Sequence, residues 1–428
     1  TIVTWGVSFL GTAQWALAST EVPEWRLAIV HDAQAEARAT VFPGGVFAGV
    51  MLGLVHIMDW LAKHPNGSTA RMLLASIRAA RRANKVLSTL PLGTADERLV
   101  GHRAEFFQQW LAHEHDDDYW ERLNLRSNAP RLPEQVHFTT GWYDTGLPST
   151  LVDYVAAREA GKTVRLVVGP WYHAGAFFDR SHTRETDTCV EAIARGEAAL
   201  EGSSVRVHVG GVNEWRDLPA WPPPDYQPTV WHLQPGGGLS TTPAHASEPD
   251  RYRYDPADPT PAVGGAKENW DGNAGAKDNR KLEQRDDVLT YTSEVLSEDV
   301  EVIGPVSAKI VLRSSLEHTD LFARLCDVDA KGRSINLCDG IRRLRPDDPS
   351  ADADGTCRVT VDLVATAHRF KAGHRIRLQV SSGAHPLLVL NPGTGAPLAT
   401  ATELRVADQE IFHDPDHMSL VALPTTRS

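Results

Sequence analysis

Apolar and polar positions alternate differently in three parts of the chain. Residues 1–44 and 129–203 combine short β-branched runs with helical segments, and residues 45–128 show mainly helical periodicity. From residue 204 to residue 428 the helical period disappears, and short alternating runs are separated by turn residues. Strands that alternate with helices are typical of a parallel sheet, whereas closely spaced strands without helices are typical of a sandwich or jelly roll. The pattern therefore predicts an α/β domain with a helical insertion, followed by an all-β domain.

A strand–helix–strand unit is predicted near the middle of the α/β part. The first strand covers residues 136–141, a helix follows with Pro148 near its start and Gly161 at its end, and the second strand covers residues 164–168. The second strand is apolar at nearly every position, as expected for a parallel sheet with helices on both faces. Residues 24–30 alternate like a further strand.

The remaining helices and strands are predicted from the helical period and from strand-like alternation. Helices of the insertion are predicted over residues 46–64, 71–90 and 101–112. Strands of the all-β part are predicted at residues 205–209, 229–233, 300–312, 321–328, 359–363 and 376–380.

Length, charge and cysteine content narrow the class of protein. A chain of 428 residues corresponds to roughly three domains at about 150 residues each. Its formal net charge of −12 argues against a nucleic-acid partner, because phosphate binding needs basic patches. No apolar run approaches the roughly 18 residues that would indicate a membrane-spanning helix. Four cysteines do not make a disulfide framework, so a cytoplasmic location is expected.

The start of the chain holds the strongest candidate for a nucleophile. An apolar run leads into Gly6-Val7-Ser8-Phe9-Leu10-Gly11, and an alanine-rich segment follows. This pattern indicates a strand, a sharp turn with Ser8 at its apex and a helix, which is the context of a Gly-x-Ser-x-Gly nucleophile elbow. The second glycine comes one residue late, so the strict motif is missed. On these residues alone a plain Gly-Ser turn is the alternative interpretation.

Asp144 and His173 share one feature with Ser8. Each follows a strand-like run, and reacting groups gather at the carboxyl ends of the strands of an open parallel sheet. The order Ser, Asp, His is also that of α/β-hydrolases. In such a triad His173 takes the Ser8 proton and returns it to the leaving group, while Asp144 fixes the imidazole tautomer. The backbone N–H of Phe9 is then one oxyanion donor.

Trp142 and Trp171 lie beside two of these positions in the sequence. They could line a substrate pocket around the acyl group. A tryptophan at the end of a strand is at least as often part of the core.

Other candidate features favour plainer structural interpretations. The run His113–Asp118 suggests a metal cluster, but its spacing fits no standard ligand pattern, so an exposed acidic loop is expected. Residues 352–355 resemble the start of a calcium loop without its remaining ligands, which favours a turn. Cys326 and Cys338 are expected to be buried free thiols.

Three short motifs resemble the catalytic motifs of the cocaine esterase family of α/β-hydrolases. That family includes X-Pro dipeptidyl-peptidases, α-amino-acid ester hydrolases and glutaryl acylases. The motifs are Gly6 to Gly11, Gly141-Trp142-Tyr143-Asp144 and Val167-Val168-Gly169-Pro170-Trp171-Tyr172-His173. In this family the late glycine after the serine is normal. The resemblance continues at residues 210–217, 254–259, 285–289, 337–342 and 373–377, so it covers nearly the whole chain.

The resemblance implies a definite architecture. It implies an α/β-hydrolase domain in residues 1–44 and 129–203, a helical cap in residues 45–128 and a C-terminal jelly roll in residues 204–428. It implies no cofactor and no metal. Thr145-Gly146-Leu147 stand where the amino-ester hydrolases have an acidic pair for the substrate ammonium group, and where cocaine esterase has an aromatic residue. Residues 177–200 match the family poorly.

The resemblance also implies an N-terminal group of strands that residues 1–428 do not contain. Early strands of the family, with a tyrosine that gives the second oxyanion donor, have no counterpart here. We therefore expect an N-terminal segment of about a hundred residues, the size of a small domain, to accompany the chain. With that segment, residues 1–5 are expected to form an interior strand that is buried on both faces and hydrogen-bonded on both edges.

The sequence thus predicts a serine hydrolase. It would cleave a small-molecule ester or amide, of the acyl-ester or X-Pro peptide type, through an acyl-enzyme. The alternative is a non-catalytic jelly-roll binding protein that carries an incomplete hydrolase relic. Three intact motifs favour the enzyme. The identity of the substrate and the formation of a homo-oligomer stay open.

Overall fold

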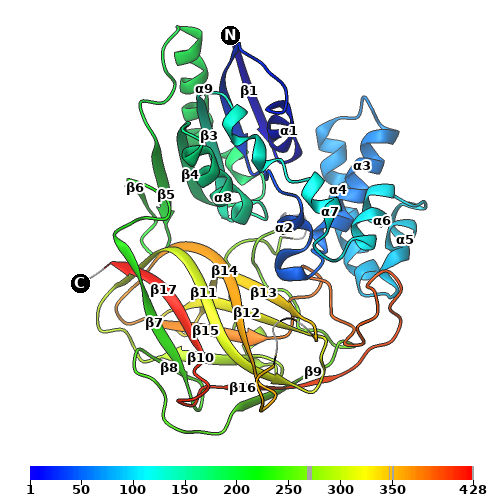
Figure 1. Ribbon diagram of the computed structural model, residues 1–428, viewed down its shortest axis with the longest axis vertical. Helices are drawn as coiled ribbons and strands as arrows, with labels where there is room; N and C mark the ends of the chain where they lie inside the picture. The colour runs from blue at the N-terminus through cyan, green and yellow to red at the C-terminus, as the bar shows by residue number, and fades with distance from the viewer. Residues whose placement is uncertain (268–271, 347, 349–350, 427–428) are drawn as a thin grey trace.

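The computed structural model describes residues 1–267, 272–346, 348 and 351–426. Figure 1 shows an α/β part that contains β1 and α8, a group of helices beside it, and a β-rich part below both. This arrangement confirms the predicted fold class, an α/β-hydrolase domain with a helical cap and a C-terminal jelly roll.

The α/β part is built on a six-stranded sheet. Its strands are β1 (Ile2–Val7), β2 (Trp25–His31), β3 (Gln135–Tyr143), β4 (Thr163–Tyr172), β5 (Ser204–Val209) and β6 (Glu214–Leu218). They lie in this order, with β1 to β5 parallel and β6 antiparallel to β5.

One predicted boundary needs correction. Residues 204–218 were expected in the C-terminal β domain, but β5 and β6 extend the first sheet. Val205, Val207 and Val209 point into the core of the α/β part. Alternation with a period of two identifies a half-buried strand, but it does not show which sheet the strand joins.

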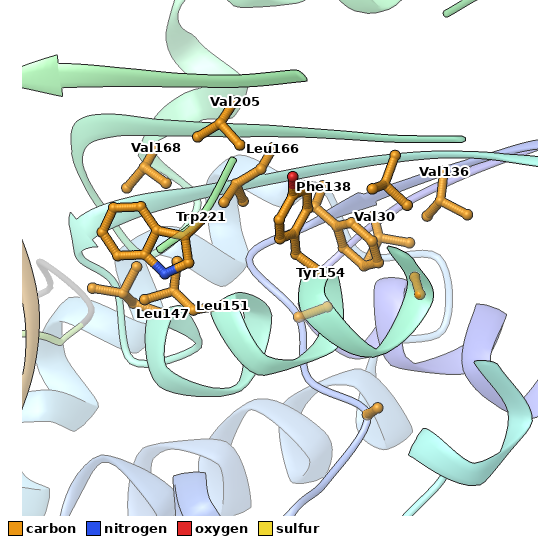
Figure 2. Close-up of a cluster of buried hydrophobic side chains, with 14 of the residues drawn as sticks. Val30, Val136, Phe138, Leu147, Leu151, Tyr154, Leu166, Val168, Val205 and Trp221 are labelled. Carbon is orange, nitrogen blue, oxygen red and sulfur yellow. The ribbon is translucent and has the colours of Figure 1, made fainter. Parts of the chain in front are cut away.

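Helices cover both faces of this sheet. Helix α1 (Phe9–Leu17) packs against β1 and β2, and α8 (Leu147–Glu159) packs against β3 and β4, in one apolar cluster that includes Ala28 and Val30 of β2. Leu27 and Ile29 of β2 form a second cluster with α9 (Arg180–Ala194). Figure 2 shows the larger cluster, in which strand residues such as Phe138 and Leu166 meet Leu147, Leu151 and Tyr154 of α8. Because both faces of β2 are covered, five of its seven residues in a row are buried, although residues 24–30 were expected to alternate.

The helical cap follows β2. Its helices are α2 (Arg38–Val41), α3 (Val50–Lys63), α4 (Thr69–Leu87), α5 (Ala95–Val100), α6 (Glu105–Ala112) and α7 (Asp118–Arg122). Short 3₁₀ turns lie near the cap at Pro43–Gly45, Leu92–Thr94 and Arg126–Arg131. Two others lie elsewhere in the chain, at Gly175–Phe178 after β4 and at Leu282–Gln284 before β10. The helix expected from residue 46 begins at Val50, because Gly44 and Gly45 have positive φ and the N–H of Gly49 bonds to Leu387 of the β part. The cap core also takes in Val389 and Leu398 of that part.

The C-terminal part is an eleven-stranded β structure. Its strands are β7 (Tyr226–Gln234), β8 (Gly238–Ser240), β9 (Asp250–Tyr254), β10 (Leu289–Ser293), β11 (Val300–Ser314), β12 (Thr319–Val328), β13 (Ser334–Leu344), β14 (Cys357–Phe370), β15 (Arg375–Ser381), β16 (Ala407–Phe412) and β17 (Leu420–Thr426). Nearly all neighbours are antiparallel, and their inward side chains form one apolar core. The jelly roll is therefore as predicted.

Strand β1 lies at one end of the six-stranded sheet. Among the described residues it pairs with β2 only, so it lies at an edge of the sheet. Ile2 is 41% exposed and Trp5 is 46% exposed. The interior position was expected only together with an N-terminal segment, so it stays a prediction.

The weaker sequence signals have structural roles. Cys326 and Cys338 are buried free thiols, as predicted. Residues 352–355 form the predicted turn, closed by the N–H of Gly355, which donates to the Asp352 carbonyl at 2.9 Å. In the His113–Asp118 run, the Asp117 side chain caps α7. No set of three or more His, Cys, Asp or Glu side chains in the described part of the chain could hold a metal ion. The described helices include none long and apolar enough to cross a membrane.

Candidate active site

Ser8 occupies a strained turn between β1 and α1. Its φ of 58° and ψ of −125° lie in a region that residues with a side chain rarely adopt. The turn is held by the N–H of Ser8, which donates to the His31 carbonyl at 2.9 Å, and by the Ser8 carbonyl, which accepts from Gly11 and Thr12. This strand, turn and helix make the predicted nucleophile elbow.

The two glycines of the motif are needed for close packing. A Cβ on Gly6 would lie 2.4 Å from the Leu10 carbonyl oxygen, and a Cβ on Gly11 would lie 2.5 Å from Cβ of Ala33. Leu10, which occupies the glycine position of the strict motif, is 63% exposed. The glycine therefore comes one residue late, because it is position 11 that faces the chain after β2.

The three predicted triad residues form one hydrogen-bonded series. Asp144 directly follows β3, and His173 directly follows β4. Nε2 of His173 lies 3.0 Å from Oγ of Ser8, and Nδ1 of His173 lies 2.7 Å from Oδ1 of Asp144. The parallel sheet thus brings the three side chains together at the carboxyl ends of its strands, as predicted.

The surroundings of Asp144 favour its ionised form. The side chain is fully buried, and burial alone raises the pKa of a carboxyl group. The charge and hydrogen bond of His173, a hydrogen bond with Asp32 and the N–H of Gly146 outweigh burial and lower the pKa of Asp144 to about 2. Thr140 also donates its hydroxyl to Oδ2 at 2.9 Å.

This ionisation sets the direction of the other hydrogen bonds. A carboxylate only accepts, so Nδ1 of His173 carries the proton and Nε2 presents a lone pair to the Ser8 hydroxyl. A hydroxyl that donates to a neutral imidazole is the arrangement in which general-base catalysis can activate a serine.

Asp32 is the main site residue that the sequence analysis missed. It directly follows β2, is 1% exposed and lies beside Asp144. Burial, and the neighbouring charge of Asp144 after it, raise the pKa of Asp32 well above its usual value. The rule that pointed to Asp144 and His173, a polar residue at the carboxyl end of a parallel strand, also applies to Asp32.

The backbone N–H of Phe9 lies at the start of α1. Phe9 is the first residue of α1 and directly follows Ser8. The first N–H groups of a helix have no acceptor within the helix. The helix dipole also favours negative charge at this end. The Phe9 N–H therefore has the position of an oxyanion donor.

Trp142 and Trp171 differ in their surroundings. Trp142 is buried, and its indole N–H donates to the His208 carbonyl at 2.7 Å. Trp142 also contributes to the wall of a large cavity. Trp171 packs against His182 and Trp215 and does not line that cavity.

The cavity has a volume of about 1000 Å³ and lies where the α/β part, the cap and the jelly roll meet. Its wall includes Thr145 and Leu147 beside Asp144, Phe42 of the cap region, and Ile341 of the jelly roll. Ser8 and His173 do not line it, so the cavity reaches the hydrogen-bonded series at Asp144. A space of this size can take a small molecule.

A mostly parallel sheet with a serine on its elbow, and an aspartate and a histidine at later strand ends, defines an α/β-hydrolase. Two family models match the chain. The model of the X-Pro dipeptidyl-peptidase (S15 family) matches residues 1–175, and that of the X-Pro dipeptidyl-peptidase C-terminal non-catalytic domain matches residues 198–422.

Individual relatives agree with these models. A cocaine esterase of Rhodococcus sp. (strain MB1 Bresler) is 34% identical over 475 aligned positions, which cover 98% of this chain and 79% of the relative. Among solved structures, an α-amino acid ester hydrolase has a TM-score of 0.79 at 20% identity and covers 99% of this chain and 76% of its own. An aminopeptidase from a marine sediment Thaumarchaeota archaeon has a TM-score of 0.78 at 21% identity, with the same coverage. These two structures support the fold.

The chain belongs to the X-Pro dipeptidyl-peptidase (S15) family, which the sequence analysis named together with cocaine esterase. It is a serine hydrolase of the ester or amide type. The alternative of a non-catalytic binding protein is therefore not supported.

Proposed function

We propose that this protein hydrolyses a small-molecule carboxylic ester through an acyl-enzyme on Ser8. His173 is the general base and acid, and Asp144 orients it. The observation that carries the proposal is the unbroken series Ser8–His173–Asp144, with distances of 3.0 and 2.7 Å, at a strained elbow.

The reaction has two halves. Oγ of Ser8 attacks the carbonyl carbon of the substrate while its proton passes to Nε2 of His173. The tetrahedral intermediate then expels the alcohol, which takes the proton from Nε2, and the acyl group stays on Ser8. Water repeats the attack on the acyl carbon, gives one proton to Nε2 and releases the acid as that proton returns to Oγ.

The negative charge of the tetrahedral intermediate requires preorganised donors. The Phe9 N–H supplies one, and removal of a single such donor costs about 3–4 kcal/mol of transition-state stabilisation in other enzymes. We expect a second donor from the N-terminal segment that the family resemblance implies. The exposed edge of β1, with the apolar side chains of Ile2 and Trp5, supports pairing with further strands there.

An ester is favoured over an amide as substrate. The 34% identical relative is named a cocaine esterase, whereas the solved aminopeptidase supports the fold alone. Comparison of p-nitrophenyl acyl esters with X-Pro p-nitroanilides tests this preference directly. We expect a higher kcat/KM for the esters, and the reverse order would assign the protein to the peptidases.

Labelling with a fluorophosphonate tests the nucleophile without knowledge of the substrate. The adduct should lie on the peptide that contains Ser8, and Ser8→Ala should abolish both labelling and hydrolysis. Ser19→Ala is the matched control, because Ser19 lies just beyond the same helix and its hydroxyl bonds only to the Ala16 carbonyl. Labelling that persists in Ser8→Ala would reject Ser8 as the nucleophile.

A further inference from the structure

Two buried carboxyl groups, those of Asp32 and Asp144, lie next to His173 and Ala174. The mechanism above uses only Asp144. The carboxyl groups of Asp32 and Asp144 are 1% and 0% exposed, and they are close enough that each shifts the pKa of the other. The main chain at Asp32 passes close to Asp144, because an added Cβ on Gly146 would lie 3.2 Å from the main-chain carbonyl carbon of Asp32 and 3.4 Å from Oδ2 of Asp144.

Asp32 also holds the segment that carries His173. Its Oδ2 accepts from the N–H of Ala174, the next residue after His173, at 2.9 Å. Its own N–H donates to the Thr139 carbonyl at 2.8 Å. Asp32 has a φ of 46°, and Asp is among the few residues with a side chain that adopt this left-handed conformation readily. The residue therefore connects the ends of β2, β3 and β4.

The distribution of donors shows which carboxyl group holds a proton. Two buried carboxylates in contact cannot both be ionised, because their repulsion is not screened by water. Asp144 accepts from Gly146 and His173 through Oδ1 and from Thr140 through Oδ2, so Oδ2 keeps a lone pair for one further donor. Asp32 accepts from Ala174 through Oδ2, whereas its buried Oδ1 receives no donor from the residues that the structure describes. The charged groups that act on Asp32 are Asp144 and His173.

We propose that Asp32 is a positioning residue that keeps a proton on Oδ1 at neutral pH, donates it to Asp144 and holds the His173 segment through Ala174. This role rests on the proposed triad. The hydrogen bond from Asp32 stabilises the charged form of Asp144 and makes it less basic. A less basic partner stabilises the imidazolium form of His173 less, so the imidazole stays available as a base at lower pH.

Two substitutions at position 32 distinguish a protonated Asp32 that donates a hydrogen bond from an Asp32 that acts through a negative charge. Asparagine in Asp32→Asn keeps a donor for Asp144 and an acceptor for Ala174, and it tolerates the left-handed backbone. Glycine in Asp32→Gly suits the backbone but removes both hydrogen bonds. Asp153→Asn is the matched control, because Asp153 is an equally buried carboxyl that binds Arg126 and the Ala35 N–H, away from Ser8.

The rate of hydrolysis of a p-nitrophenyl ester is measured against pH for each variant of the complete protein. Asp32→Asn should keep kcat within about threefold and leave the acid limb of the profile in place. Asp32→Gly should lower kcat roughly ten- to a hundredfold, the scale of a lost hydrogen bond to a charged group. It should also move the acid limb to higher pH, whereas Asp153→Asn should lower the Tm without moving the limb.

A direct readout does not depend on activity. The infrared difference spectrum between wild type and Asp32→Asn, taken near neutral pH, should show the carbonyl band of one protonated carboxyl group in the wild type. Absence of that band would overturn the proposal. This test does not need Asp32→Gly, so it holds even if that variant fails to fold. Equal losses in Asp32→Asn and Asp32→Gly would overturn it as well. The proposed function fails separately, by retained activity in Ser8→Ala.

Discussion

Nδ1 of His173 lies 2.7 Å from Oδ1 of Asp144, and this contact decides which imidazole nitrogen faces the serine. Because the pKa of Asp144 is low, the proton stays on Nδ1, and Nε2 presents a lone pair to the Ser8 hydroxyl. A residue whose only effect is to orient another has no effect once that other residue is gone.

The first prediction follows from this dependence. His173→Ala and Ser8→Ala should each lower kcat by roughly 10⁶-fold, and the double variant should be scarcely worse than either single one. Steady-state kinetics of the four proteins on one ester measures the coupling. Losses that multiply in the double variant would show that the two residues do not act as one unit.

The second prediction concerns the late glycine. Gly11→Ala places a methyl group 2.5 Å from Cβ of Ala33. The alanine side chain cannot rotate away from the clash, so the backbone must shift. The overpacking should lower the free energy of unfolding by about 1–3 kcal/mol and displace the elbow. Denaturant unfolding measures the first effect and the rate of fluorophosphonate labelling the second.

Leu10→Ala is the control for that substitution. Leu10 lies on the same helix and is 63% exposed, so its replacement should change stability by only about 0.5 kcal/mol or less. Equal stability of the Gly11→Ala and Leu10→Ala variants would contradict the packing explanation.

The two glycine positions also explain what the sequence could and could not predict. Ser8, Asp144 and His173 were identified from strand ends and chain order, and both features depend on local patterns. The contact of Gly11 with Ala33 depends on how α1 packs on the chain after β2, which no local pattern contains. Only the family resemblance could identify the late glycine as normal.

Asp32 was missed, and residues 204–218 were assigned to the other sheet, for related reasons. A single aspartate after a strand is common in turns, and its burial beside Asp144 is a result of tertiary structure. Strand β5 alternates like the strands of the jelly roll, so its pattern does not identify the sheet that it joins. Local periodicity predicts elements better than it predicts their neighbours.

The third prediction concerns the cavity wall. Trp142→Phe leaves the His208 carbonyl without its donor and enlarges the cavity beside Asp144. We expect the variant to lower the free energy of unfolding by about 1–3 kcal/mol. It should also lower KM for bulky acyl esters relative to acetyl esters, because the wider cavity admits a larger acyl group.

Trp221→Phe separates these two effects. Trp221 packs against Trp142 with 5.9 Å between ring centroids, but it does not line the cavity. Its replacement should lower stability and leave the ratio of the two KM values unchanged. If both variants change the ratio equally, the cavity is not where the acyl group binds. A contact of Trp171 with substrate stays a prediction.

The last prediction concerns stability in acid. His31, His137 and His182 are almost fully buried against one another, with ring centroids 4.9 to 6.3 Å apart. Burial, with the repulsion of His182 after it, lowers the pKa of His31 to about 3, and burial lowers the pKa of His182 to about 4. Burial lowers the pKa of His137 as well.

The sign of the effect follows from proton uptake. Between about pH 6.5 and pH 4 the unfolded chain binds protons on these histidines and the native protein does not, so acid favours unfolding. The free energy of unfolding should fall through this window by up to roughly 1.4 kcal/mol per pH unit for each histidine, and level off once the native groups bind protons too.

His182→Gln removes one of these buried histidines, so its Tm should fall less than that of the wild type between about pH 7 and pH 4.5. His245→Gln, at an exposed position, should follow the wild-type curve. Parallel curves for wild type and His182→Gln would mean that the buried histidines do not control acid stability.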